Sequence, residues 1–394
     1  MHKFKTLMSA FMAAALIACI SLFAVADGDD GVDFVSGSVV AAPSVMAKSV
    51  VLMDTATRSV LFEQNSNEAV SISHLTKLMT LLLTAEAIDK GELTLETMLT
   101  TSASANSMGD PQIWLNVGEQ ISVDELIKAI TIGNANDAAC VLAQSIGGTT
   151  EEFVSLMNQR ASQLGMTNTI FTNPTGIDDD TQYSTAFDVA LLSCEVLKHE
   201  NLIPYMTTWM LDVRNGSTNL VNSNRLVRTY KGITGLKAGS SQKAGSCIAT
   251  SAHRNNFGVV CVILGSENPD VRFDDAKTLL DYAFSAYEMF IPEIDAEKLK
   301  PISVKSGQSL NVKIEMASAP GLVIPKGTSA GIETVITVEE CVEAPVEKGR
   351  EFGKICFYRG EELITETRII ASEEIDRISV GFSFKKLLDY LLKF

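Results

Sequence analysis

The chain is poor in basic residues, in histidine and in motifs that bind metals or cofactors. It carries 32 Lys and Arg against 48 Asp and Glu, which gives a formal net charge of −16 at pH 7. An acidic chain repels phosphate backbones, so we expect no nucleic-acid partner. Its 4 His and 7 Cys form no CxxC pair and no His/Cys cluster, so we expect neither a metal site nor a cofactor.

The overall composition is that of a globular protein, and an apolar segment stands at the N-terminus. The chain is 46% hydrophobic and 20% charged, and its 394 residues allow two domains. Lys3 and Lys5 precede a nearly unbroken apolar run at 11–25, and Ala24-Val25-Ala26 has the small residues of a cleavage site. We therefore predict a signal peptide at 1–26 and export to the outer face of the cytoplasmic membrane or the cell wall.

Two other interpretations of the N-terminus stay open. The apolar run is short for a membrane span, which argues against a retained anchor. A lipoprotein-like box ends at Cys19, but the apolar run continues past it, which argues against lipidation there. Residues 27–45 are rich in Asp, Gly, Ser and Ala and are typical of a flexible linker.

The six cysteines after Cys19 are of two kinds. Four lie in apolar runs, where a thiol packs like a small hydrophobic side chain. Cys341 and Cys356 flank an expected hairpin, and an exported protein permits a disulfide between them. The sequence leaves open whether these two cysteines pair.

Residues 46–290 combine strands and helices in an order that indicates one α+β domain. A hairpin at 50–62 comes first, and His74 then opens an apolar helix to 88, with Ser73 as its expected N-cap. Strands from both ends of the domain would form one sheet covered by helices. The other expected helices span 123–146 with a break near Gly133-Asn134, 151–164, 185–197 and 274–290, and the expected strands span 227–230, 236–240, 245–252 and 257–265.

The C-terminal part has a different residue pattern from the domain before it. Residues 291–380 alternate short β-branched stretches with Gly and Pro, which predicts a small all-β domain. Residues 381–394 form an amphipathic helix with three lysines on its polar face, too short to span a bilayer. Such a helix suits an anionic membrane surface, although docking on its own domain is the alternative.

Three short stretches carry the chemistry. They are His74-Leu75-Thr76-Lys77, Asn134-Ala135-Asn136 and Lys237-Ala238-Gly239-Ser240, separated by about 60 and then about 100 residues. In order and spacing they resemble S-x-x-K, S-x-N and K-T-G of the serine-type D-Ala-D-Ala carboxypeptidases. These are low-molecular-mass penicillin-binding proteins related to class A β-lactamases.

The resemblance extends well beyond the motifs. It is strong over about residues 46–290, and the β-domain and terminal helix also fit the family's layout. It implies a β-lactamase- or transpeptidase-like domain, an antiparallel sheet with helices on both sides, followed by a small all-β domain. The implied partner is a peptidoglycan stem peptide ending in D-Ala-D-Ala. Matching stretches include Thr76-Lys77-Leu78-Met79-Thr80, Asn136-Asp137-Ala138-Ala139, Phe171-Thr172-Asn173-Pro174-Thr175-Gly176 and Gly235-Leu236-Lys237-Ala238-Gly239.

The resemblance also assigns roles to the motif residues. The position of the serine nucleophile is His74, while the general-base lysine is retained as Lys77. The proton-relay serine is Asn134, and the substrate-binding asparagine is retained as Asn136. The resemblance implies that the third motif binds the substrate carboxylate and completes the oxyanion hole. Its residues here are Lys237, Ala238, Gly239 and Ser240.

Each motif has therefore lost one hydroxyl. Loss of a catalytic nucleophile costs about 10⁶ in turnover, so we expect catalysis to be impaired. The larger imidazole of His74 would fill the place of the scissile carbonyl. Ser73 is a poor substitute because one residue along a helix is a rotation of about 100°.

Three functions follow from these observations. The first is a non-catalytic homologue that binds stem peptide or a partner enzyme. The second is an active carboxypeptidase with an unusual nucleophile. The third is a membrane-surface scaffold with a vestigial pocket. The sequence does not determine the oligomeric state.

Overall fold

The structure is a computed structural model, which describes residues 40–392. The predicted signal peptide, Cys19 and most of the predicted linker lie outside the described residues. The N-terminal domain is built on a five-stranded antiparallel sheet with the order β2-β1-β9-β8-β7, so β7 lies at an edge. Its strands are β1 (Ser49–Asp54), β2 (Val60–Gln64), β7 (Ile233–Ser241), β8 (Gly245–Arg254) and β9 (Phe257–Ser266).

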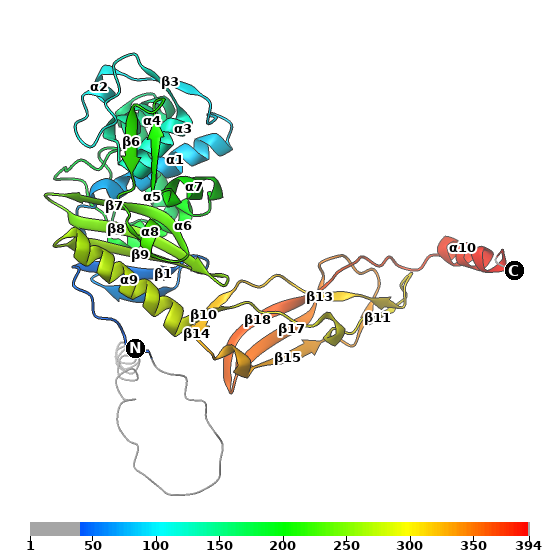
Figure 1. Ribbon diagram of the computed structural model, residues 1–394. Helices are drawn as coiled ribbons and strands as arrows, with labels where there is room; N and C mark the ends of the chain where they lie inside the picture. Colours follow the sequence, from blue (N-terminus) through cyan, green and yellow to red (C-terminus); the bar gives the residue numbers. More distant parts are fainter. Residues whose placement is uncertain (1–39, 393–394) are drawn as a thin grey trace, which may run out of the picture. The chain divides into compact units, whose positions relative to one another are not determined.

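Strands from the two ends of the domain meet in this sheet, as expected. Val51 of β1 pairs with Val262 of β9, more than two hundred residues later. Alternate residues of β1 face opposite layers: Val51 joins one buried apolar cluster and Val50 another. Figure 1 shows α9 (Pro269–Ala286) on one face of the sheet and the other large helices on the opposite face.

The helical layer opposite α9 holds the first two motifs. A 3₁₀ turn, η1 (Ser73–Thr76), leads into α1 (Lys77–Asp89), which is buried along most of its length. The break expected near Gly133-Asn134 separates two helices. The remaining helices of this layer are α2 (Ala103–Asn106), α3 (Val123–Gly133), α4 (Asn136–Gly147), α5 (Thr150–Leu164), α6 (Ala186–Val196) and α7 (Ile203–Thr207), with η2 (Glu200–Leu202) before α7.

One expected strand is wrong, one expected helix is four residues too long, and two hairpins were not expected. Residues 227–230 lie mainly in a short helix, α8 (Leu226–Thr229), and the expected helix at 274–290 ends at Ala286. Its last four residues form β10 (Tyr287–Phe290), because they pair with β14 (Leu322–Pro325) instead of continuing the helix. The unexpected hairpins are β3 (Met98–Thr100) with β4 (Gln120–Ser122), and β5 (Met210–Val213) with β6 (Thr218–Val221).

The C-terminal part is all-β apart from short 3₁₀ turns and a final helix. It contains β11 (Ile302–Lys305), β12 (Asn311–Val312), β13 (Ile314–Met316), β15 (Ile332–Val338), β16 (Cys341–Glu343), β17 (Glu351–Arg359) and β18 (Glu362–Ala371). Cys341 and Cys356 are free thiols on strands of different sheets. The terminal helix is α10 (Val380–Leu391). The α+β class with a small all-β C-terminal domain is thus confirmed.

Candidate active site

Lys77 is the first residue of α1, and it is the centre of the site. Its side chain is fully buried. Nζ donates to Asn136 Oδ1 over 2.7 Å and to the Thr175 carbonyl, and it lies 3.2 Å from His74 Nδ1. An amine has three hydrogen-bonding positions in either protonation state. These contacts use all three, so Lys77 has no position left with which to take a proton from a nucleophile.

His74 stands one turn before Lys77, at the position that the motif resemblance assigns to the serine nucleophile. Burial, with the nearby charges of Lys77 and Lys237, lowers the pKa of His74 to about 3. The imidazole is therefore neutral at physiological pH. The ring lies against the third motif: a Cβ added to Gly239 would be 2.7 Å from His74 Cβ and 2.8 Å from Cδ2. The His74 side chain thus fills the space that a side chain at position 239 would need.

Ser73 is not the N-cap that the sequence predicted. It lies inside the 3₁₀ turn η1, with φ of +48°, and η1 and α1 begin without a side-chain cap bond. Its side chain is fully buried, and Oγ has no hydrogen-bond partner. The residue is held in this conformation by tertiary packing, and its hydroxyl makes no hydrogen bond with Lys77.

The second motif lies between α3 and α4. Asn134 caps α3 in a left-handed conformation with φ of +57°, and its Nδ2 donates to the Ala238 carbonyl over 3.1 Å. Asn136 begins α4. Besides accepting from Lys77, its side chain donates to the carbonyls of Gly109 and Asp110. Asn134 therefore ties the second motif to the third, and Asn136 ties it to the first.

Lys237 lies on β7 and is fully buried. Its Nζ donates to the carbonyls of Ile130 over 2.5 Å and Thr131 over 3.0 Å, near the C-terminal end of α3. Burial lowers the pKa of Lys237 to about 7. Its positive charge would lie close to Lys77 and His74, since it contributes to the lowered pKa values of both.

The rest of the third motif contributes little chemistry. The Ala238 side chain packs in the buried cluster beneath α9, so it offers no hydrogen bond to a ligand. Ser240 is exposed, and its Oγ accepts from Arg272 Nη1 over 3.1 Å. The same Nη1 donates to the Gly239 carbonyl over 2.6 Å, while Nε is buried without a partner.

Arg272 is a site residue that the sequence reasoning missed. It lies in the first turns of α9 and is 5% exposed, and burial lowers the pKa of Arg272 to about 10. An arginine in a helix facing the sheet has no local sequence signal. Ser223 was missed for the same reason: its Oγ donates to the Ala238 carbonyl over 2.8 Å.

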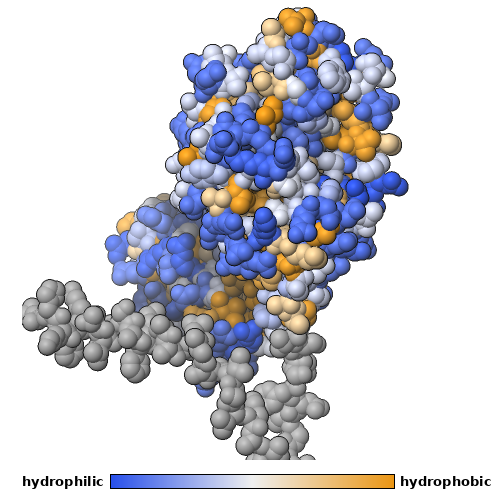
Figure 2. Space-filling model, turned by 90° about the vertical axis from the view of Figure 1, so that its left-hand side faces the viewer, coloured by the Kyte–Doolittle hydropathy of each residue, from blue (hydrophilic) through white to orange (hydrophobic). Residues whose placement is uncertain are grey.

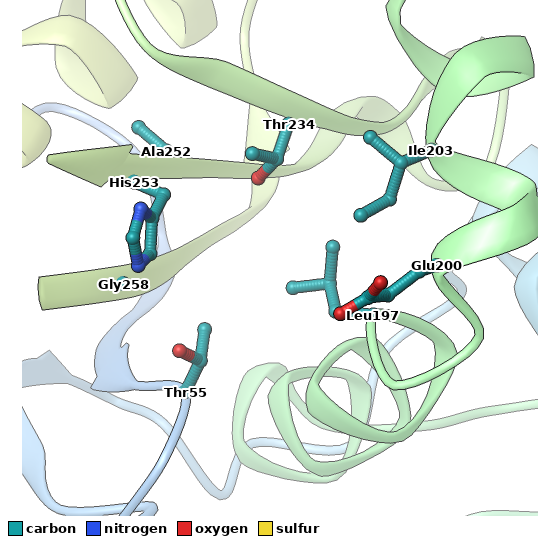
Figure 3. Close-up of a pocket in the computed structure, with 8 residues that line it drawn as sticks. All are labelled: Thr55, Leu197, Glu200, Ile203, Thr234, Ala252, His253 and Gly258. Carbon is teal, nitrogen blue, oxygen red and sulfur yellow. The ribbon is translucent and has the colours of Figure 1, made fainter. Parts of the chain in front are cut away.

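A cavity lies away from these motifs. It has a volume of about 350 Å³ and is lined by residues at the start of β7, at the end of β8 and near η2. Figure 3 shows His253 and Glu200 on opposite sides of its open space. It contains none of the predicted site residues. Among residues 40–392, no three His, Cys, Asp or Glu side chains are grouped to hold a metal ion.

The fold is that of the transpeptidase-like domains of penicillin-binding proteins. The three motif stretches converge between the helical layer and the edge strand of an antiparallel sheet, as the resemblance implies. Comparison with known sequences names the family. The family described as D-alanyl-D-alanine carboxypeptidase matches residues 37–268, and the penicillin-binding protein 5 C-terminal domain matches residues 294–377. The chain belongs to the D-alanyl-D-alanine carboxypeptidase family, whose members act in peptidoglycan metabolism.

Individual relatives cover both domains. The chain is 34% identical to the D-alanyl-D-alanine carboxypeptidase DacF of Bacillus subtilis over 352 residues, which is 88% of this chain and 90% of DacF. It is 30% identical to DacC of Escherichia coli, with 91% of each chain covered. Penicillin-binding protein 5 of Haemophilus influenzae superposes with a TM-score of 0.74 at 26% identity, over 86% of this chain and all of that one.

Proposed function

We propose that this protein is a member of the carboxypeptidase family that binds peptidoglycan stem peptides without hydrolysing them. The observation that carries the proposal is the position of His74. Its imidazole lies where a nucleophilic hydroxyl would stand, contacts Lys77 and leaves no gap in front of Gly239. A neutral histidine could attack a carbonyl in principle. Here Nδ1 of His74 is in contact with Lys77 Nζ, and the imidazole ring packs against Gly239 of β7.

The proposal that a peptide still binds is supported by charge. Lys77, Lys237 and Arg272 bring three basic groups to one buried region of an otherwise acidic chain. The buried Nε–H of Arg272 lacks a partner, and an unpartnered buried donor costs free energy that an acceptor would recover. A terminal carboxylate supplies such an acceptor. Ala238 offers the peptide no side-chain hydrogen bond, because its side chain packs in the cluster beneath α9.

The test separates binding from cleavage. A peptide ending in Lys-D-Ala-D-Ala is titrated into the protein by calorimetry, and released D-Ala is assayed in the same samples. We expect saturable binding without D-Ala release, and weaker binding in the Arg272→Met variant. Release of D-Ala at a rate typical of an enzyme would refute the absence of catalysis. Absence of binding at millimolar peptide would leave a vestigial pocket as the better account.

An active enzyme that uses Ser73 has little support. Its hydroxyl is fully buried and makes no hydrogen bond to the lysine that would have to activate it. A Ser73→Ala variant that lost D-Ala release would favour this alternative over our proposal.

We also propose that α10 lies on an anionic membrane surface. Phe384, Leu387 and Leu391 expose 64%, 56% and 66% of their surface, while lysines occupy the other side of the helix. Within residues 40–392, no helix is long and apolar enough to cross a membrane. The test is sedimentation with vesicles of anionic or neutral lipid. Binding to anionic vesicles should disappear in a Leu387→Glu/Leu391→Glu variant, and persistence there would exclude α10 as the contact.

A further inference from the structure

Trp114 is exposed on a segment in which the backbone groups of both neighbouring residues, Ile113 and Leu115, are hydrogen-bonded. Its side chain is 65% exposed, whereas the neighbouring Ile113 and Leu115 are buried in the helical layer. Trp114 has φ of +60°, a left-handed conformation that bulky side chains rarely adopt. Among the described residues, no hydrogen bond or ring contact involves the Trp114 side chain.

The strained conformation is imposed by the two residues on either side. The N–H groups of Ile113 and Leu115 both donate to the carboxylate of Asp137, over 3.2 and 3.0 Å. Asp137 is fully buried in the first turn of α4. The Leu115 carbonyl accepts from Asn106 Nδ2 over 2.6 Å. A rare backbone conformation held from both sides costs free energy and is typical of positions where function requires one orientation.

A second hairpin holds the segment from the other side. Arg214, in the turn between β5 and β6, donates from Nη1 to the Ile113 carbonyl over 2.8 Å. Its Nε and Nη2 form a paired contact with Glu119, both bonds being 2.7 Å long. Glu119 in turn accepts from the Asn116 backbone and side chain. The indole is therefore presented on a rigid support rather than on a mobile loop.

The same segment leads directly into the candidate active site. The Pro111 carbonyl accepts from the Asn136 backbone N–H over 2.7 Å, and Gly109 and Asp110 accept from its side chain. Asn136 in turn binds Lys77. A molecule that contacts Trp114 would therefore lie on the same segment that binds Asn136 of the site.

The surroundings of Trp114 favour a neutral ligand with an apolar face. Glu119 of this segment is paired with Arg214, and Asp110 adds a further negative charge. Arg214, the cationic group that contacts the segment, is already engaged with Glu119 and the Ile113 carbonyl. Hydrophobic side chains on the face shown in Figure 2 form small separate groups among hydrophilic ones. A stable protein interface buries about 800 Å² per partner, which Trp114 and the exposed Val117 of the same segment do not supply.

We propose that Trp114 is a stacking platform for an N-acetylated amino sugar of the glycan strand that carries the stem peptide. The inference rests on the proposed function, because it takes peptidoglycan as the ligand. A pyranose ring presents a flat face of C–H groups, and its N-acetyl methyl group adds apolar surface. An indole fixed in one orientation binds such a face without losing side-chain freedom.

The direct test uses the fluorescence of Trp114. The chain has 2 Trp, so the Trp209→Phe variant leaves Trp114 as the only one. We expect a hexasaccharide of β-1,4-linked N-acetylglucosamine to shift its emission to shorter wavelength and to saturate. A D-Ala-D-Ala peptide without sugar should leave the emission unchanged. An emission spectrum that does not respond to millimolar sugar overturns the proposal.

Sedimentation with purified peptidoglycan provides a second readout. Trp114→Ala should weaken binding about tenfold, and Trp114→Phe less than about threefold. Met98→Ala is the matched control, because Met98 is 52% exposed and lies outside this segment. If the Trp114→Ala variant binds peptidoglycan as tightly as the wild type does, Trp114 is not a stacking platform. If the protein responds to sugar but does not bind the stem peptide, the proposed function alone is overturned. If it binds the stem peptide but does not respond to sugar, only this inference is overturned.

Discussion

His74 Nδ1 lies 3.2 Å from Lys77 Nζ, so the residue at the nucleophile position binds the lysine that would otherwise activate a nucleophile. Lys77 also binds Asn136 and the Thr175 carbonyl, which completes its hydrogen bonding. In our proposal, the site holds Lys77 in place without leaving it free to act as a base. This relationship is the structural basis of our proposal that the site binds a peptide without hydrolysing it.

Restoring the three hydroxyls should restore acylation. The triple variant His74→Ser/Asn134→Ser/Ala238→Thr recreates all three family motifs on a chain that retains Lys77 and Lys237. We expect it to form a covalent adduct with penicillin, and His74→Ser alone to react at least about tenfold more slowly, since relay and carboxylate hydroxyls each contribute. Intact-mass spectrometry follows the adduct. If the triple variant folds and stays unmodified, hydroxyl loss is not the reason for inactivity.

The lowered pKa of His74 predicts a dependence of stability on pH. In the unfolded chain His74 takes up a proton near pH 6.5, whereas in the folded chain it does so near pH 3. Stability from this residue is therefore present above pH 6.5 and is lost as the pH falls towards 3. The loss is at most about 1.4 kcal/mol per pH unit.

The His74→Asn variant isolates this effect. Asparagine does not titrate, so the difference in unfolding free energy between wild type and variant should shrink or reverse from pH 7 to pH 4. Urea titrations at several pH values measure it. Parallel pH profiles for the two proteins would show that His74 titrates normally and is not enclosed by Lys77 and Gly239.

Gly239 should be intolerant of a side chain because of His74. A Cβ at this position would lie 2.7 Å from His74 Cβ, so Gly239→Ala should lower the unfolding free energy by about 1–3 kcal/mol. The cost should be smaller in a His74→Gly background, which removes the opposing atoms. Gly331→Ala is the control, because nothing lies within 4 Å of its added Cβ. Additive costs in the double variant would contradict the packing of His74 on Gly239.

Asp137 should be essential for the segment that carries Trp114. Its carboxylate accepts from the backbone N–H groups of Ile113, Leu115 and Ala138. Asp137→Ala should lower stability by about 2–4 kcal/mol, since these donors would be buried without partners. Hydrogen exchange at 111–117 should accelerate more than elsewhere. Asp180→Ala, at a fully exposed carboxylate, should change neither the stability nor the exchange rate. Equal effects of the two substitutions would show that Asp137 does not hold the segment in place.

The sequence predicted the elements whose signal is local. Apolar periodicity located α1 and the break between α3 and α4, and alternation located β8 and β9. Tyr287–Phe290 was assigned to a helix because its pairing partner β14 lies more than thirty residues away. The expected strand at 227–230 contains β-branched and aromatic residues, which favour strands. These residues instead lie mainly in a helical turn, α8, that packs near β7. Tertiary contacts decided both cases.

The motif residues were predicted from the sequence, but their surroundings were not. Spacing and resemblance identified His74, Lys77 and Lys237 as neighbours. They gave no indication that Arg272 reaches the Gly239 carbonyl from α9, or that Ser73 is buried with a left-handed backbone. Such features depend on how helices pack against the sheet, and no local pattern encodes that.

The most direct test of the central claim is covalent labelling of the wild-type protein with a fluorescent penicillin. The triple variant with restored hydroxyls serves as the positive control and a denatured sample as the background. With His74 bound to Lys77 and packed on Gly239, we predict no label on the wild-type chain after prolonged incubation. A stoichiometric covalent label on the folded wild-type protein would contradict the account.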